Sequence, residues 1–149
     1  MCRQREVRPV LMPYRFKIRH DDVQHTVDVP ALTVPRCGNC GELLFDNDAG
    51  AQMSAALRAQ IHLLSPEQIR SSRTSLGLGR EELSARIGMP PETVEELEEH
   101  LRIQSRALDN LLRVFFAVPQ ARTALDEAKG SPDFGRAVSD VAGQPSPIS

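Results

Sequence analysis

Between residues 65 and 116, apolar side chains recur at helical spacing in four short blocks, and glycine or proline interrupts the pattern between blocks. This spacing is typical of amphipathic helices, and glycine and proline are the residues that end them. The first block follows a good N-cap, Ser65, and has Pro66 at its first helical position. The predicted helices cover residues 65–76, 80–87, 90–98 and 105–116, and a shorter one covers residues 120–128 after a break at Val118-Pro119.

The turn between the second and third predicted helices carries a more specific signal. Periodicity alone fits any small domain of four helices. The order of residue types at this turn also resembles the second and third helices of an Xre/Cro-type DNA-binding domain. The matching residues are Ser84 or Ala85, Gly88, Thr93, Val94, Leu97 and Glu98. His100 stands where that family normally has a glycine, and the resemblance implies a helix-turn-helix domain over residues 65–128.

Upstream of these helices the pattern changes to a two-residue alternation. Residues 14–19 alternate apolar with basic side chains, and residues 23–29 alternate valine or histidine with polar residues. Such alternation is typical of strands with one buried face, and the polar residues 20–22 fit a turn between them. We therefore predict a β-hairpin that ends at Pro30, in a protein of the α+β class.

Two cysteines follow the hairpin in the motif Cys37-Gly-Asn-Cys40, and Gly41 comes next. This spacing lets two sulfur atoms converge on one tetrahedral ion, for which zinc is the expected metal. A structural zinc site needs four ligands and this motif supplies two, so ordinary thiols are the alternative. A thioredoxin-like redox motif fits less well, because that motif lies between a strand and a helix of an α/β unit.

The hairpin followed by Val29-Pro-x-Leu-x-x-Pro-x-Cys-x-x-Cys-Gly-Glu42 resembles the YgiT-type zinc finger, the N-terminal half of MqsA-type antitoxins. In that family an earlier C-x-x-C completes the site, and here Cys2 corresponds to its second cysteine. The implied zinc ligands are Cys2, Cys37 and Cys40. Three explanations remain for the fourth ligand: a cysteine encoded upstream of Met1, a finger that has lost it, or His20 or His25 in its place.

The segment between the two modules has apolar residues at helical intervals among alanines, and we expect its apolar side to pack against the helix-turn-helix. The predicted organisation is a zinc-finger-like module (residues 1–48), a linker helix (residues 49–64), the helix-turn-helix domain (residues 65–128) and a disordered tail (residues 129–149). The tail is rich in glycine, proline, serine and aspartate, a composition that does not support a packed core.

Composition narrows the function classes. The 149 residues carry a net charge of −2, so any contact with nucleic acid needs a local basic face. No apolar run reaches the roughly 18 residues of a membrane span, and no apolar signal segment begins the chain, so we expect a cytoplasmic protein without membrane contact. No nucleophile–base pair, phosphate loop or carboxylate pair with catalytic spacing is visible, which argues against an enzyme.

Both modules follow the order found in MqsA-type antitoxins, and the resemblance covers residues 2–128. It implies a type II antitoxin: a DNA-binding regulator that binds a duplex operator as a homodimer, represses its own promoter and neutralises a toxin protein. The apolar residues expected at the dimer interface are Leu108, Phe115, Phe116, Val118 and Leu125. The residues expected at the DNA are Arg70, Arg73, Arg80, Pro91, Glu92, Thr93, Glu95, Glu96 and Arg102.

The third predicted helix is acidic, with five glutamates between Glu92 and Glu99. Glutamate can accept a hydrogen bond from cytosine, but five carboxylates on one short helix are repelled by the negatively charged phosphates of DNA. We therefore expect phosphate contacts from the flanking arginines to matter more than base contacts from this helix. The alternative is a protein-interaction module that keeps the helix-turn-helix scaffold and no longer reads DNA.

Overall fold

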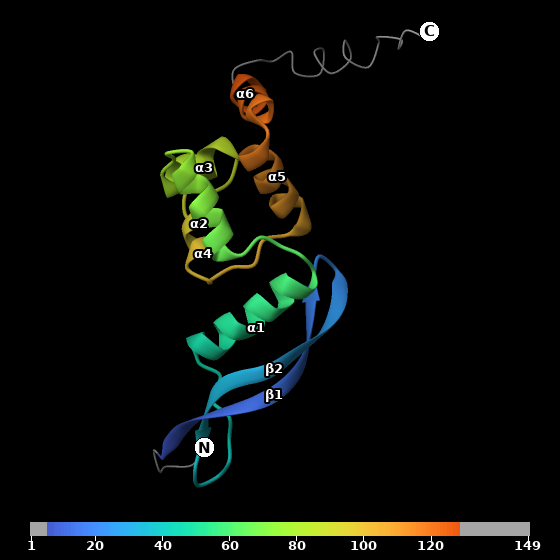
Figure 1. The fold of residues 1–149 in the computed structure, drawn as a ribbon, viewed down its shortest axis with the longest axis vertical. Helices are drawn as coiled ribbons and strands as arrows, with labels where there is room; N and C mark the ends of the chain where they lie inside the picture. Colours follow the sequence, from blue (N-terminus) through green and yellow to red (C-terminus); the bar gives the residue numbers. More distant parts are fainter. Residues whose placement is uncertain (1–5, 129–149) are drawn as a thin grey trace, which may run out of the picture.

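The computed structural model describes residues 6–128, which form a two-stranded antiparallel hairpin followed by six helices (Figure 1). The elements are β1 (Val7–His20), β2 (Val23–Cys37), α1 (Asn47–Gln60), α2 (Pro66–Ser75), α3 (Arg80–Arg86), α4 (Thr93–Glu98), α5 (Arg106–Ala117) and α6 (Pro119–Ala128). The predicted α+β class is confirmed, and the predicted tail, residues 129–149, lies outside the described residues. None of the helices in the described part of the chain is long and apolar enough to cross a membrane.

The hairpin turn is made by Asp21 and Asp22, whose φ angles are 50° and 61°. A two-residue turn of type I′ needs positive φ at both positions, because only this geometry matches the twist of the flanking strands. Aspartate tolerates positive φ better than most residues do, since its short polar side chain hydrogen-bonds locally. The predicted turn over residues 20–22 is therefore present.

The hairpin continues beyond the predicted end at Pro30, and that prediction was wrong. Pro30 lies at a register irregularity, because Met12 pairs with Leu32 whereas Tyr14 pairs with Val29. Proline has no N–H to donate to the ladder, and an irregular step between two edge strands tolerates this loss. The strand can therefore pass through the proline and carry the first cysteine at its end.

Helix α1 packs on β2, whereas the sequence had suggested packing against the helix-turn-helix. It begins after Asp46, whose Oδ1 accepts a hydrogen bond from the N–H of Ala49 at 2.9 Å. The side-chain amide of Gln52 bonds both the N–H and the C=O of Thr33 in β2, at 3.0 and 3.1 Å. An isolated two-stranded hairpin is only marginally stable in water, and it is stabilised here because the apolar side of α1 packs against it. The buried residues that result are Val29, Leu32, Val34 and Ala49.

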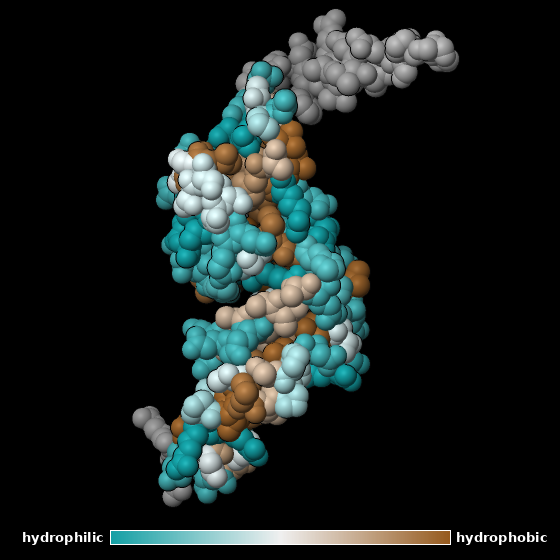
Figure 2. Space-filling model, in the orientation of Figure 1, coloured by the Kyte–Doolittle hydropathy of each residue, from teal (hydrophilic) through white to brown (hydrophobic). Residues whose placement is uncertain are grey.

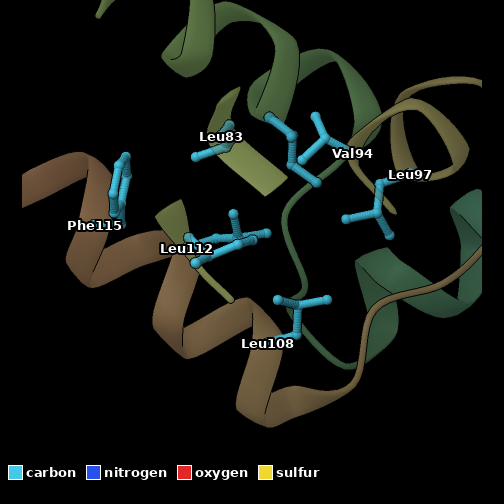
Figure 3. Close-up of a cluster of buried hydrophobic side chains, with 8 residues drawn as sticks. Leu83, Val94, Leu97, Leu108, Leu112 and Phe115 are labelled. Carbon is cyan, nitrogen blue, oxygen red and sulfur yellow. The ribbon is translucent and has the colours of Figure 1, made fainter. Parts of the chain in front are cut away.

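Helices α2 to α6 enclose the second core, whose side chains Figure 3 shows. The helices predicted for this region occur at nearly their predicted bounds. The buried residues are Ile69, Leu83, Ile87, Val94, Leu97, Leu108, Leu112 and Phe115. Ser65 caps α2 through a reciprocal pair of hydrogen bonds with Gln68. The third predicted helix begins at Thr93 and not at Pro90.

Most apolar residues of α5 pack into this core, so less apolar surface is exposed than the predicted dimer interface requires. Leu108 and Phe115 are buried in the core, and Phe116 packs partly buried against it. Val118 is 39% exposed and Val114 is 48% exposed. The interface expected at Leu108 and Phe115 is therefore contradicted, because their side chains point inward.

The tip of the hairpin reaches the start of α5 and joins the two halves of the molecule (Figure 1). The Oδ2 atom of Asp21 accepts a hydrogen bond from the N–H of Arg106 at 2.6 Å. This N–H lies in the first turn of α5, where no helical acceptor exists and a negative charge is favoured. The ring of His20 lies beside it, with Nε2 2.9 Å from the carbonyl oxygen of Gln104.

Buried polar groups lie behind this contact. The Oδ1 atom of Asp109 accepts hydrogen bonds from the N–H of Leu64 at 2.7 Å and from Nε2 of Gln104 at 3.1 Å. Arg58 of α1 is 2% exposed and donates from Nη2 to the carbonyl oxygen of Arg102 at 2.6 Å. The two modules thus meet through specific hydrogen bonds as well as through the chain that connects them.

Replacing Asp21 by glycine should loosen the hairpin tip from α5 without disturbing the turn. Glycine adopts the positive φ, but the N–H of Arg106 loses a charged acceptor, so its amide hydrogen exchange should rise about tenfold. Hydrogen exchange followed by NMR measures this. Asp22→Gly, which also keeps the turn but removes a carboxylate that does not touch α5, should leave that amide unchanged. Equal exchange rates in the two variants would contradict the contact.

Candidate functional site

The predicted recognition helix, α4, is anchored on its inner side by Thr93, Val94 and Leu97, all buried. The N–H of Val94 donates to Oγ of Ser84 on α3 at 3.2 Å, so a small residue at position 84 lets the two helices meet closely. Gly88, in the turn between them, has a φ of 74°, which glycine adopts without steric cost. Helices α3 and α4 therefore meet at a tight corner, with the outer side of α4 at the surface.

The carboxylate of Glu98 is completely buried and lies among three arginines. Arg73 of α2 binds both oxygens, from Nε to Oε1 at 2.6 Å and from Nη2 to Oε2 at 3.0 Å. Arg80 donates from Nε to Oε2 at 2.9 Å, and Nε of Arg70 lies 3.4 Å from the same oxygen. Arg73 also donates to the carbonyl oxygen of Leu78 at 2.8 Å. This one carboxylate ties the end of α4 to α2 and to the start of α3.

Burial alone would raise the pKa of Glu98, but the hydrogen bonds and positive charges of Arg73 and Arg80 outweigh it and hold the pKa below its ordinary value. Asp109 in α5 follows the same rule. Its burial favours the neutral form, and the hydrogen bond from Arg113 with others from the backbone and Gln104 lowers its pKa overall. Both carboxylates are therefore charged structural groups, since each is surrounded by the partners that a buried charge requires.

The exposed acids of α4 engage the arginines from outside. Oε1 of Glu99 lies 2.8 Å from Nη2 of Arg80, and Oε1 of Glu95 lies 3.7 Å from Nη1 of the same arginine. Glu96 pairs with Arg102 at 3.6 Å. Each arginine that the sequence assigned to the DNA is thus in an ion pair with a glutamate, and the surface around α4 carries little free positive charge.

Two of the residues expected at the DNA lie in the interior instead. Thr93 is 0% exposed, because it shares the inner side of α4 with Val94 and Leu97. The side chain of Arg73 is 11% exposed, and its N–H groups are taken by Glu98 and a carbonyl oxygen. Neither side chain can reach a duplex in this arrangement, against the prediction. The others lie at or near the surface: Arg70, Arg80, Pro91, Glu92, Glu95, Glu96 and Arg102.

The ion-pair cluster itself was not foreseen from the sequence, although a signal for it exists. Glu98 follows Val94 by four positions and Leu97 by one, so it lies on the apolar side of α4. A carboxylate on a buried side needs a cationic partner, because an unpaired buried charge is very costly. Arg73, at the end of the first predicted helix, would then have been assigned to Glu98 and not to a phosphate.

The predicted metal motif forms a tight turn at the end of β2. The N–H of Gly41 donates to the carbonyl oxygen of Cys37 at 2.9 Å, and Gly41 has a φ of 73°. Cys37 is buried and Cys40 is exposed. Within residues 6–128 no group of three or more histidine, cysteine, aspartate or glutamate side chains is arranged to hold a metal. The third expected ligand, Cys2, lies outside this range, so the zinc site stays a prediction.

The histidines considered as substitute ligands lie at the wrong end of the hairpin. Cys37 pairs with Val7 at one end of the ladder, whereas His20 pairs with Val23 at the other. At about 3.3 Å per residue the strands separate these ends by about 40 Å. His20 and His25 therefore cannot complete a site at Cys37, and that explanation for the fourth ligand is excluded.

Comparison with known proteins does not assign the chain to a family: no family model matches it, and no curated protein sequence matches it significantly. Function must therefore be inferred from the residues and geometry of the site itself.

Replacing Glu98 by glutamine should destabilise the domain formed by α2–α6 by about 3 kcal/mol, because it keeps the shape but leaves Arg73 without its charged partner. Urea denaturation followed by circular dichroism measures the free energy of unfolding. Glu81→Gln, at an exposed acid of α3, is the matched control and should change it by less than about 0.5 kcal/mol. Equal stabilities of the two variants would show that the cluster does not hold the domain together.

The lowered pKa values of Glu98 and Asp109 make stability depend on pH. Below about pH 5 the unfolded chain takes up protons at these positions before the folded protein does, so the free energy of unfolding should be highest near neutrality and fall as the pH drops below about 4. Denaturation midpoints between pH 7 and pH 3 measure this slope. The Glu98→Gln variant should show a shallower slope, and an unchanged one would exclude Glu98 as its source.

Proposed function

We propose that this chain is a DNA-binding transcription regulator of the type II antitoxin kind, which contacts duplex DNA through α4. The observation that supports this most is the Glu98 cluster, in which one buried carboxylate ties together α2, α3 and α4, the three short helices expected of a helix-turn-helix domain. Pro91 and Glu92 are exposed just before α4, and Glu95 is exposed on its first turn. In this motif the exposed side of the recognition helix enters the major groove.

DNA binding by this surface requires an exchange of ion pairs. The side chains of Arg70, Arg80 and Arg102 are 48%, 32% and 44% exposed, so each can turn from its glutamate to a phosphate. Phosphate contacts release counterions, so binding weakens steeply as salt rises. Each glutamate left beside the duplex opposes the attraction by roughly 1 kcal/mol or less in water. The resulting affinity is low, depends on salt and relies on phosphates more than on bases.

A homodimer, a structural zinc ion and a toxin partner belong to the same proposal. The exposed Val114 lies on α5 three residues after the partly buried Leu111, and the exposed Val118 follows the end of the helix, so these residues offer apolar surface to a second copy. Such a dimer would present two α4 helices to half-sites one turn of DNA apart. The zinc ligands would be Cys2, Cys37 and Cys40, and the ion would cross-link the knuckle. The toxin partner rests on the resemblance to MqsA-type antitoxins.

One observation favours the second candidate, a protein-interaction module on the same scaffold. The arginines around α4 are already neutralised by Glu95, Glu96, Glu98 and Glu99. A helix surface of this charge suits a basic protein partner better than it suits a phosphate backbone. The two candidates differ in one measurable property, which is affinity for duplex DNA at low salt.

Replacing both Glu95 and Glu96 by glutamine should strengthen binding to any duplex by about tenfold, because two opposing charges are removed and Arg80 and Arg102 are released. Fluorescence anisotropy with a labelled fragment of the chain's own promoter and a random duplex measures this at two salt concentrations. Glu42→Gln combined with Asp48→Asn removes the same charge from the hairpin module and serves as the control.

The outcomes separate the candidates. Stronger binding to both duplexes supports phosphate contacts by the released arginines. Loss of preference for the promoter would show instead that the two glutamates read cytosines. If neither the unmutated protein nor the double variant binds either duplex at low salt, the regulator is rejected and the interaction module takes its place.

A further inference from the structure

Helix α1 covers only one of the two strands on the inner side of the hairpin. The buried core residues of this half come from β2 and α1, whereas the inward residues of β1 are only partly buried: Val10, Met12, Tyr14 and Phe16. A groove of about 370 Å³ lies between β1 and α1, and its apolar lining includes Phe16, Ile18, Met53 and Leu57. Figure 2 shows apolar surface on this half of the molecule. The segment after β2 covers part of this strip, because Phe45 contacts the ring of Tyr14 and Leu43 packs against the core, whereas Phe16 and Ile18 are left facing the groove.

Gly50, in the first turns of α1, also lines this groove, and the chain itself does not require a glycine there. Its φ is not positive, and an added Cβ would meet no atom within 4 Å. Glycine within a helix is less stable than alanine, so the position carries a cost without an internal benefit. What glycine does permit is the close approach of another backbone. This points to an occupant that comes from outside the described chain.

The edge of β1 beside the groove can accept another strand. The sheet has two strands, so alternate N–H and C=O groups of β1 point away from β2. Pro9 and Pro13 protect the first part of the strand, because proline has no N–H. From Tyr14 to His20 the ladder has neither a proline nor a register irregularity. Residues 14–20 therefore form an open edge of the kind used in strand addition.

The outer side of the same stretch is positively charged. Arg15, Lys17 and Arg19 alternate with the inward residues and lie about 6.8 Å apart along the strand. Arg15 pairs with Asp28 and Arg19 with Asp22, whereas Lys17 has no ion pair with any residue between 6 and 128. A second copy of β1 would set like charges opposite one another, which is destabilising, and an acidic strand would set opposite charges there.

We propose that residues 14–20 of β1 bind an extended segment of a partner protein in which acidic and apolar residues alternate. The backbone of the segment pairs with the edge of β1, and its apolar side chains enter the groove beside α1. Its acidic side chains point to the other side, towards Lys17 and its neighbours. A single strand can place apolar side chains in the groove and acidic side chains near Lys17, because successive side chains of a strand point to opposite faces. The site lies on the hairpin module and does not depend on DNA binding through α4.

A labelled eight-residue peptide that alternates glutamate and valine tests this with the full-length protein. A second peptide of the same composition, with the glutamates and valines in separate blocks, is the control ligand. Fluorescence anisotropy at low salt should show the alternating peptide binding at least about tenfold more tightly, a difference of about 1.4 kcal/mol. Hydrogen exchange should then slow at alternate amides within residues 14–20.

Two variants locate the site. Lys17→Glu reverses the unpaired charge. Gly50→Leu places a side chain at the groove from a position where an added Cβ meets no atom within 4 Å, so each variant should bind the alternating peptide about tenfold more weakly or worse. Arg8→Glu makes the same charge change on β1 before Pro13 and should alter affinity by less than about twofold. Thermal unfolding should show that all three variants remain folded, since Gly50→Leu improves the helix propensity of α1.

Equal binding of the two peptides, undiminished binding by the Lys17 and Gly50 variants, or protection mapped to α2–α6 would each overturn the proposal. Absence of binding by the unmutated protein at millimolar peptide would do the same. A protein that binds the peptide and no duplex keeps this site and loses the DNA-binding function, and the reverse result removes only this site.

Discussion

The buried carboxylate of Glu98 is the constraint on which the helical half of the molecule depends. A charge removed from water has to be neutralised by partners with good geometry, and Arg73 and Arg80 supply these from two other helices. Helix α4 has six residues, too few to be stable by itself. Its position is therefore set by what its inner side contacts: apolar neighbours along most of its length and the arginines at its end. The sharp corner with α3 follows from this anchoring.

The ion pairs around Glu98 also reduce the positive charge that the surface presents to a binding partner. Arginines that would otherwise be free to meet phosphates are oriented inward by Glu98 or held at the surface by Glu95 and Glu99. The outer side of α4 and of the residues that flank it is consequently acidic. The exposed cations that have no ion pair within residues 6–128 all lie on the hairpin: Arg8, Lys17 and Arg36. The partners proposed for the two halves therefore differ in charge: duplex DNA for the helical half and an acidic segment for the hairpin.

The two halves are joined by few but directional contacts. Helix α1 belongs to the hairpin through its contacts with β2, and it meets the helical half through the buried Arg58, which donates to the carbonyl oxygen of Arg102. The hairpin tip meets α5 through Asp21 at the helix N-terminus, where backbone N–H groups lack partners. These contacts are hydrogen bonds and not a large apolar interface, so the two halves keep separate apolar cores. In the hairpin half, α1 covers β2 and leaves the inner side of β1 partly exposed.

The sequence alone was enough to predict the local elements. Residue alternation predicted the hairpin, and caps, glycines and helical spacing predicted α2, α3, α5 and α6, because these signals act within a few residues of each other. What only the tertiary structure decided was which side chains meet: that Arg73 binds Glu98, that Thr93 is buried, that α1 covers β2, and that His20 lies far from Cys37. These outcomes depend on contacts between residues distant in sequence, and on the need of each buried charge and apolar face for a partner, which local patterns do not encode.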